Sequence, residues 1–144
     1  HERTMLWLSF ADRLQDLVDD MTPITALDRD HYATLVMDTQ ALRLLGSAAL
    51  ARGARGEEDV AGMSVLKLLG SEAVQAASEH AVAALGADGL IHPAVTSPHV
   101  SLNLDPHVGS WFDRYVRSFA GTIAGGTSEI QRNIIAQRVL GLPR

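Results

Sequence analysis

Apolar side chains return every three or four positions along most of this 144-residue chain, with charged side chains between them. This spacing predicts amphipathic helices, because it gathers the apolar side chains on one face of each helix. The pattern occurs in five segments, at residues 2–20, 28–56, 57–86, 110–119 and 127–140. No segment convincingly alternates apolar and polar residues, so no strand is predicted.

Local signals set the expected ends of the longer helices. Asp28 or Asp30 is suited to cap the second helix, which should end near Gly53 or Gly56. The acidic residues at 57–59 suit the start of the third helix, because the amino end of a helix carries partial positive charge. The chain should therefore turn back on itself between the second and third helices.

A loop is predicted over residues 86–109, because two glycines end the third helix and three prolines interrupt the segment that follows. A connection of this length usually has a function of its own or packs against another part of the protein. His92, His99 and His107 lie in it, but their spacings are wider than those of ordinary metal-ligand pairs. No metal site is expected.

The apolar content is 47%, whereas aromatic residues make up only 5% of the chain. Alanine and leucine supply much of the apolar content, which favours closely packed helices over a β-sandwich. Together with the five helical segments, this composition predicts an all-α fold, an antiparallel bundle similar to a four-helix bundle. Residues 1–144 are enough for one domain with its own core.

The net charge of −5 gives no support to nucleic-acid binding. The absence of cysteine excludes disulfides and thiolate zinc sites within the sequence, and it fits a cytoplasmic location. No apolar run is long enough for a membrane span, and no signal peptide is visible. The first residue is His1 rather than methionine, so an upstream part of the protein is expected to be missing from this sequence.

The start of the last predicted helix carries the most chemical information. Gly125 and Gly126 allow another group to approach the backbone closely. Ser128 and Gln131 have the spacing of a capping box. The exposed N–H groups of such a helix start favour phosphate or polyhydroxyl ligands, although an ordinary capped helix has the same pattern.

Residues 124–136 read AGGTSEIQRNIIA and resemble a segment near the C-terminus of acyl-CoA dehydrogenases, (Y/A)-(E/G)-G-T-S-(E/Q)-I-Q-R. Weaker similarity extends over residues 41–45, 67–68, 71–73 and 85–89. The resemblance implies that residues 1–144 are the C-terminal helical domain of such an enzyme, without its N-terminal helical and middle β domains. The isolated segment is therefore expected to be inactive.

The resemblance also implies a cofactor and a reaction. By analogy, FAD is bound by Gly125, Gly126, Thr127, Ser128 and Glu129, with Thr127 and Glu129 on its ribityl–diphosphate side. The implied substrate is an acyl-CoA thioester. The implied reaction is α,β-dehydrogenation, in which a glutamate takes the α-proton and the β-hydrogen leaves as hydride to flavin N5.

The family offers two positions for that glutamate. Many members place it directly before G-T-S, where this chain has Gly125, or Gly126 if the doubled glycine shifts the register. A second group of the family places it in a Glu-Arg dipeptide at the start of the first helix, which here is Glu2-Arg3. The resemblance therefore implies Glu2 as the catalytic base. The alternative is a catalytically silent subunit that binds flavin or has a structural role.

Two family segments that contact a neighbouring subunit's FAD are altered in this chain. Residues 21–31 contain no R-x-x-F-G segment, and residues 82–89 contain no glutamine. Asp88 places negative charge where the family meets a diphosphate, which is unfavourable. The chain thus resembles the α2β2 enzymes of actinobacterial steroid degradation, and a tetramer with a second acyl-CoA dehydrogenase-like subunit is implied. A homotetramer, or an unrelated helical interaction module, is the alternative.

Overall fold

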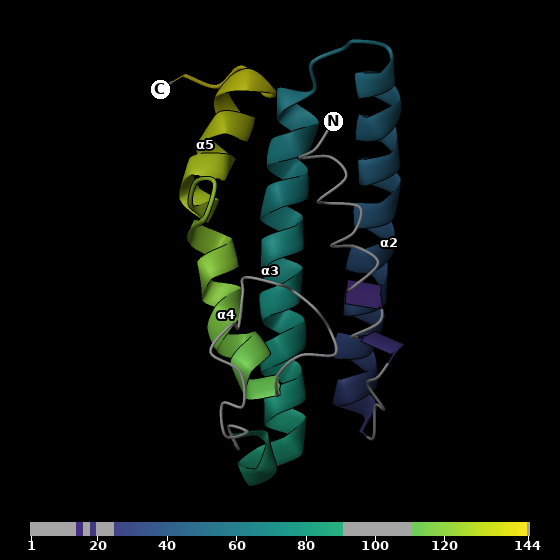
Figure 1. Ribbon diagram of the computed structural model, residues 1–144, viewed down its shortest axis with the longest axis vertical. Helices are drawn as coiled ribbons and strands as arrows, with labels where there is room; N and C mark the ends of the chain where they lie inside the picture. The colour runs from purple at the N-terminus through teal and green to yellow at the C-terminus, as the bar shows by residue number, and fades with distance from the viewer. Residues whose placement is uncertain (1–13, 16–17, 20–24, 91–110, 144) are drawn as a thin grey trace, which may run out of the picture.

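The computed structural model describes residues 14–15, 18–19, 25–90 and 111–143. Its elements, labelled as in Figure 1, are α2 (Ala26–Ala54), α3 (Val60–Leu85), the 3-10 helix η1 (Gly86–Leu90), α4 (Trp111–Ile123) and α5 (Ser128–Arg138). The described residues include no strand. The predicted all-α fold is confirmed.

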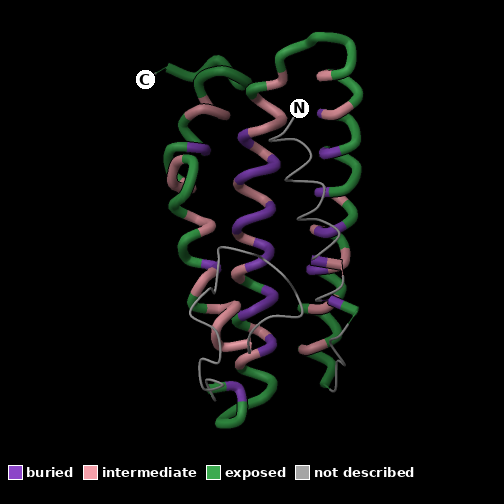
Figure 2. Tube along the Cα trace, viewed as in Figure 1, coloured by how far each residue is buried: buried purple, intermediate pink, exposed green. Residues whose placement is uncertain are grey.

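Helix α3 is the centre of the bundle. α2 packs along one side of it, and α4 and α5 follow one another along the other side (Figure 1). α2 and α3 run in opposite directions, as do α3 and the α4–α5 pair. The buried positions accordingly follow α3 over most of its length (Figure 2). The bundle is antiparallel, as the sequence predicts.

The core is formed by small and medium-sized apolar side chains. α2 contributes residues seven positions apart, which places them on one face of the helix. Of the predicted first helix, residues 14–15 and 18–19 are described and are helical, and Leu14 and Val18 are fully buried in the same cluster. The cluster comprises Leu14, Val18, Leu35, Leu42, Ala49, Leu66, Ala73, Val74 and Ala77.

The cap of α2 differs from the prediction. Thr25 is the N-cap, and its hydroxyl oxygen accepts from Asp28 N at 3.1 Å. The Asp28 carboxylate accepts from Thr25 N at 2.7 Å, which completes a capping box. The predicted caps Asp28 and Asp30 are therefore wrong, because Asp28 serves as the partner in the first turn instead.

The other helix ends also correct some predictions. α3 begins as expected, with Asp59 as its N-cap. Beyond Gly86, where the sequence predicts a loop, the chain first forms the 3-10 helix η1. α4 continues to Ile123, four residues past its predicted end, and Gly121 does not stop it, lying inside the helix against Ser71 of α3. The three loop histidines lie outside the described residues.

Within the described ranges, no group of three or more histidine, aspartate or glutamate side chains is arranged to hold a metal ion. No helix in the described part of the chain is long and apolar enough to cross a membrane.

Candidate functional site

A glycine turn joins the end of α4 to the start of α5, alongside α3 (Figure 1). Gly125 has φ +71° and Gly126 has φ +103°, which are backbone conformations that side chains with a Cβ rarely adopt. The Gly126 N–H donates to the carbonyl of Ile123 at 3.2 Å. The two glycines therefore end α4 and let α5 begin almost at once, farther along the same side of α3.

The two glycines have different surroundings. A Cβ added at Gly126 would lie 2.8 Å from Gln131 Nε2 and 3.3 Å from Ile130 Cγ2. A Cβ added at Gly125 would meet nothing within 4 Å. A side chain at Gly126 would therefore crowd the Gln131 amide and Ile130 inside the turn, whereas the space beside Gly125 is open.

Thr127 caps α5. Its hydroxyl oxygen accepts from Ile130 N at 3.4 Å, and its carbonyl accepts from Gln131 N at 2.9 Å. The capping box predicted from Ser128 and Gln131 is wrong, because Ser128 is already the first residue of the helix. The side chain of Gln131 is instead buried beneath the turn and donates to the carbonyl of Gly125 at 2.9 Å.

Glu129 lies in the first turn of α5, and its side chain is 77% exposed. Its own backbone N–H and the Thr127 hydroxyl lower the pKa of the carboxyl by hydrogen bonding, and the positive charges of Arg132 and Lys67 add to this effect. Partial burial acts in the opposite direction but is outweighed. Glu129 is therefore an anionic hydrogen-bond acceptor at neutral pH.

α3 holds the turn from the side of the core. Lys67 Nζ donates to the carbonyl of Thr122 at 3.0 Å, near the end of α4. Glu72 accepts from Arg132 Nη2 at 2.6 Å, in the middle of α5. The sequence assigns no role to Lys67, Glu72 or the Gln131 amide bond. The one available signal is that Lys67 is the single lysine of the sequence.

Burial lowers the pKa of Lys67 from its ordinary 10.5, and the negative charges of Glu72 and Glu129 only partly oppose this. Because the folded pKa lies below the unfolded one, the unfolded chain binds more protons between the two values. The free energy of unfolding, taken relative to the Lys67→Met variant, should therefore rise with pH across that window. Urea unfolding of both proteins from neutral pH to about pH 10 measures this difference, and a falling difference would contradict it.

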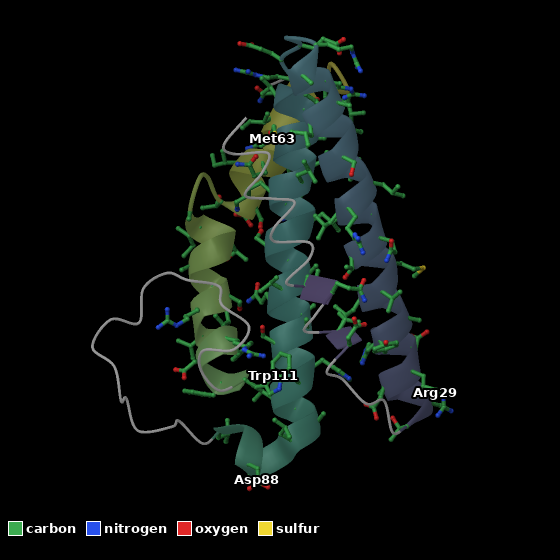
Figure 3. The ribbon with its side chains drawn as sticks, turned by 45° about the vertical axis from the view of Figure 1, so that its right-hand side comes forward. Arg29, Met63, Asp88 and Trp111 are labelled. Atoms are coloured by element: carbon green, nitrogen blue, oxygen red, sulfur yellow. The ribbon has the colours of Figure 1, made fainter. Side chains whose placement is uncertain are left out.

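The predicted cofactor-binding residues, Gly125 to Glu129, lie together in this one turn. The predicted base, Glu2, lies outside the described residues. Asp88 lies in η1, at the end of α3 opposite to Met63 (Figure 3). Lys67 lies one helical turn after Met63 and contacts Thr122, just before the glycine turn. The glycine turn is therefore near the Met63 end of α3, far from Asp88 within this chain.

A family model described as the C-terminal domain of acyl-CoA dehydrogenases matches residues 26–140. The chain belongs to the acyl-CoA dehydrogenase family. The match contains the helices α2 to α5 and the glycine turn. Family membership supports the oxidoreductase class.

Curated acyl-CoA dehydrogenases are similar to parts of this chain. Acyl-CoA dehydrogenase IpdE1 of Mycobacterium tuberculosis is 47% identical over 60 residues, which are 42% of this chain and 14% of that protein. IpdE1 of Mycolicibacterium smegmatis is 68% identical over 34 residues, which are 24% of this chain and 9% of that protein.

Two solved structures share the fold of this acyl-CoA dehydrogenase domain. The Tcur3481-Tcur3483 steroid ACAD matches with a TM-score of 0.65 and 24% identity over 99% of this chain. A glycine-to-alanine variant of it matches with a TM-score of 0.63 and the same identity and coverage. The chain spans about a third of the length of these structures, 34% and 35%.

Proposed function

We propose that this chain is the C-terminal helical domain of an enzyme that carries out FAD-dependent α,β-dehydrogenation of an acyl-CoA thioester. The observation that carries the proposal is the turn from Gly125 to Glu129 at the start of α5. The turn lies within the part of the chain that matches the family, and the space beside Gly125 is open. An oxidoreductase of this kind needs a bound flavin and a base, and the chain offers candidates for both.

The turn fits part of a flavin nucleotide. The N–H groups of the first turn of a helix have no acceptor inside that helix, so those of Ser128 and Glu129 face its amino end. They and the helix dipole favour a phosphate group there. The anionic carboxylate of Glu129 repels phosphate but accepts hydrogen bonds from hydroxyls, so it suits the ribityl chain.

The chemical step needs a base on the side of the substrate. Gly125 occupies the position where many family members carry glutamate, and it has no side chain to act. Glu2 is the proposed base, which takes the α-proton within hydrogen-bond reach. Bound FAD supplies the acceptor for the β-hydride at N5. Keeping water away from Glu2 would raise its pKa and make it a stronger base.

We further propose that the enzyme is a heteromer of unlike acyl-CoA dehydrogenase chains. Asp88 lies at the end of α3 opposite to Met63, whereas Lys67, one turn after Met63, contacts α4 just before the glycine turn, so η1 is distant from a flavin held at this turn. Asp88 also makes η1 unsuited to a neighbour's diphosphate. The similar structure, the Tcur3481-Tcur3483 steroid ACAD, is named for two chains, which supports an assembly of unlike subunits. Because that protein is named a steroid ACAD, steroid acyl-CoA thioesters are the first substrates to assay.

Exposed apolar side chains on α2 support such packing against other parts of a larger assembly. Leu27, Met37 and Leu44 are each more than 60% exposed. Apolar surface of this kind commonly belongs to interfaces. A catalytically silent subunit is the second candidate function, favoured by the glycine at position 125.

Flavin stoichiometry tests the proposal. The full-length protein is expressed alone and with a second dehydrogenase-like chain, and bound FAD is measured by its visible absorbance after purification. We expect one FAD for each pair of unlike chains and little flavin in the chain expressed alone. A homotetramer with one FAD per chain would contradict the heteromer, and a flavin-free complex would contradict the function.

A further inference from the structure

The sequence contains a single lysine among twelve basic residues, and this lysine is buried. Lys67 lies on α3 with 5% of its surface exposed. Lysine normally keeps its ammonium in water, so burial costs free energy unless the group gains partners. Here the partner is the carbonyl of Thr122, which accepts from Lys67 Nζ at 3.0 Å.

The carbonyl of Thr122 belongs to the last turn of α4. If the helix continued, it would accept from the N–H of Gly126, four residues later. That N–H bonds instead to the carbonyl of Ile123, because the chain turns at the glycines. Carbonyls at the end of a helix lack partners and carry its partial negative charge. The ammonium of Lys67 supplies both a donor and a compensating charge.

A second contact from α3 holds the other side of the turn. Glu72, five residues after Lys67, accepts from Arg132 Nη2 at 2.6 Å. Arg132 lies in α5, and its Nη1 is 4.0 Å from Glu129 Oε1. A single helix therefore fixes the chain both before and after the turn, through contacts 55 and 60 residues apart in the sequence.

We infer that Lys67 is a positioning residue for cofactor binding: its bond to the Thr122 carbonyl fixes where α4 ends, and hence where residues 125–129 lie relative to α3. Lys67 touches no reacting atom and acts only through the turn. The inference rests on the proposed FAD-binding function. It adds that tight FAD binding requires the buried ammonium of Lys67 as a hydrogen-bond donor.

The test is the Lys67→Met variant of the full-length protein, prepared with any subunit that copurifies. Methionine keeps the apolar contacts and removes the donor. Removing a buried ammonium relieves its desolvation cost but leaves the Thr122 carbonyl without this donor, so the two effects oppose each other and the unfolding temperature should change little. The dissociation constant for FAD should nevertheless rise about tenfold. Hydrogen exchange should become faster in the peptide covering 123–131 but not in α2.

Arg52→Met is the matched control. It removes a different ion pair of a basic side chain, with Asp59 at 2.7 Å, at the junction of α2 and α3. We expect FAD affinity and exchange in the turn to match the wild type. This comparison separates loss of any basic side chain from loss of the contact with α4.

Unchanged FAD affinity in Lys67→Met, with flavin bound by the wild type, would overturn the inference. A lower unfolding temperature with faster exchange throughout the domain would also overturn it, since Lys67 would then be a general core residue. If the wild type binds no FAD, the proposed function is contradicted instead. Hydrogen exchange in residues 123–131 would then still test whether the bond from Lys67 to Thr122 holds the turn. If Lys67→Met does not fold, Glu72→Gln should speed exchange in the turn and weaken FAD about threefold; no change in either would overturn the role of α3.

Discussion

Replacing Glu2 by glutamine is expected to lower the turnover of acyl-CoA by about a thousandfold while leaving flavin content unchanged. Glutamine is nearly the same size as glutamate but cannot accept the α-proton. The α-proton of a thioester is only weakly acidic, so loss of the base affects the chemical step directly. The measurement is steady-state dehydrogenation by the full-length enzyme with an artificial electron acceptor, together with bound FAD per chain.

Glu58→Gln is the control, because it removes an exposed carboxylate before α3 and should keep full activity. Adding Gly125→Glu to the Glu2→Gln enzyme should recover part of the turnover, since a Cβ at position 125 would meet nothing within 4 Å and only the backbone strain at φ +71° opposes the change. Full activity in Glu2→Gln would eliminate Glu2 as the base and favour a silent subunit.

Gly126→Ala should destabilise the domain by about 2–3 kcal/mol and lower FAD affinity at least tenfold. The added Cβ would lie 2.8 Å from Gln131 Nε2, and the backbone at φ +103° is itself strained for alanine. Relief of the contact would require Gln131 to leave the Gly125 carbonyl, which would then lose its bond at 2.9 Å. Urea unfolding and flavin titration of the full-length protein measure the two effects.

Gly125→Ala is the matched control for that substitution. Its backbone also has positive φ, but its added Cβ meets no atom, so the cost should be the conformational strain alone, about 1 kcal/mol. Equal destabilisation by the two alanines would show that the steric contact at Gly126 contributes nothing. A smaller effect at Gly126 than at Gly125 would contradict the packing described for the turn.

The sequence predicted the helices and the place of the glycine turn, because both depend on local patterns. Periodic apolar residues of α3 form much of the core, and Asp59 caps that helix as predicted. On α2 only one face is buried, and the apolar Met37 and Leu44 are exposed. The caps at Thr25 and Thr127 were predicted one to five positions too late. Several neighbouring side chains can cap a helix, and the choice depends on how the preceding chain enters it.

The sequence by itself determined an all-α domain of the acyl-CoA dehydrogenase family with a glycine turn before its last helix, since helical periodicity and a contiguous motif are properties of neighbouring residues. Only the tertiary structure decided that Lys67 meets Thr122 and that Glu72 meets Arg132. Spacing along the chain does not say which face of α3 receives α4 and α5. That pairing follows from the packing of the whole bundle, and it fixes the turn on which the proposed flavin contacts depend.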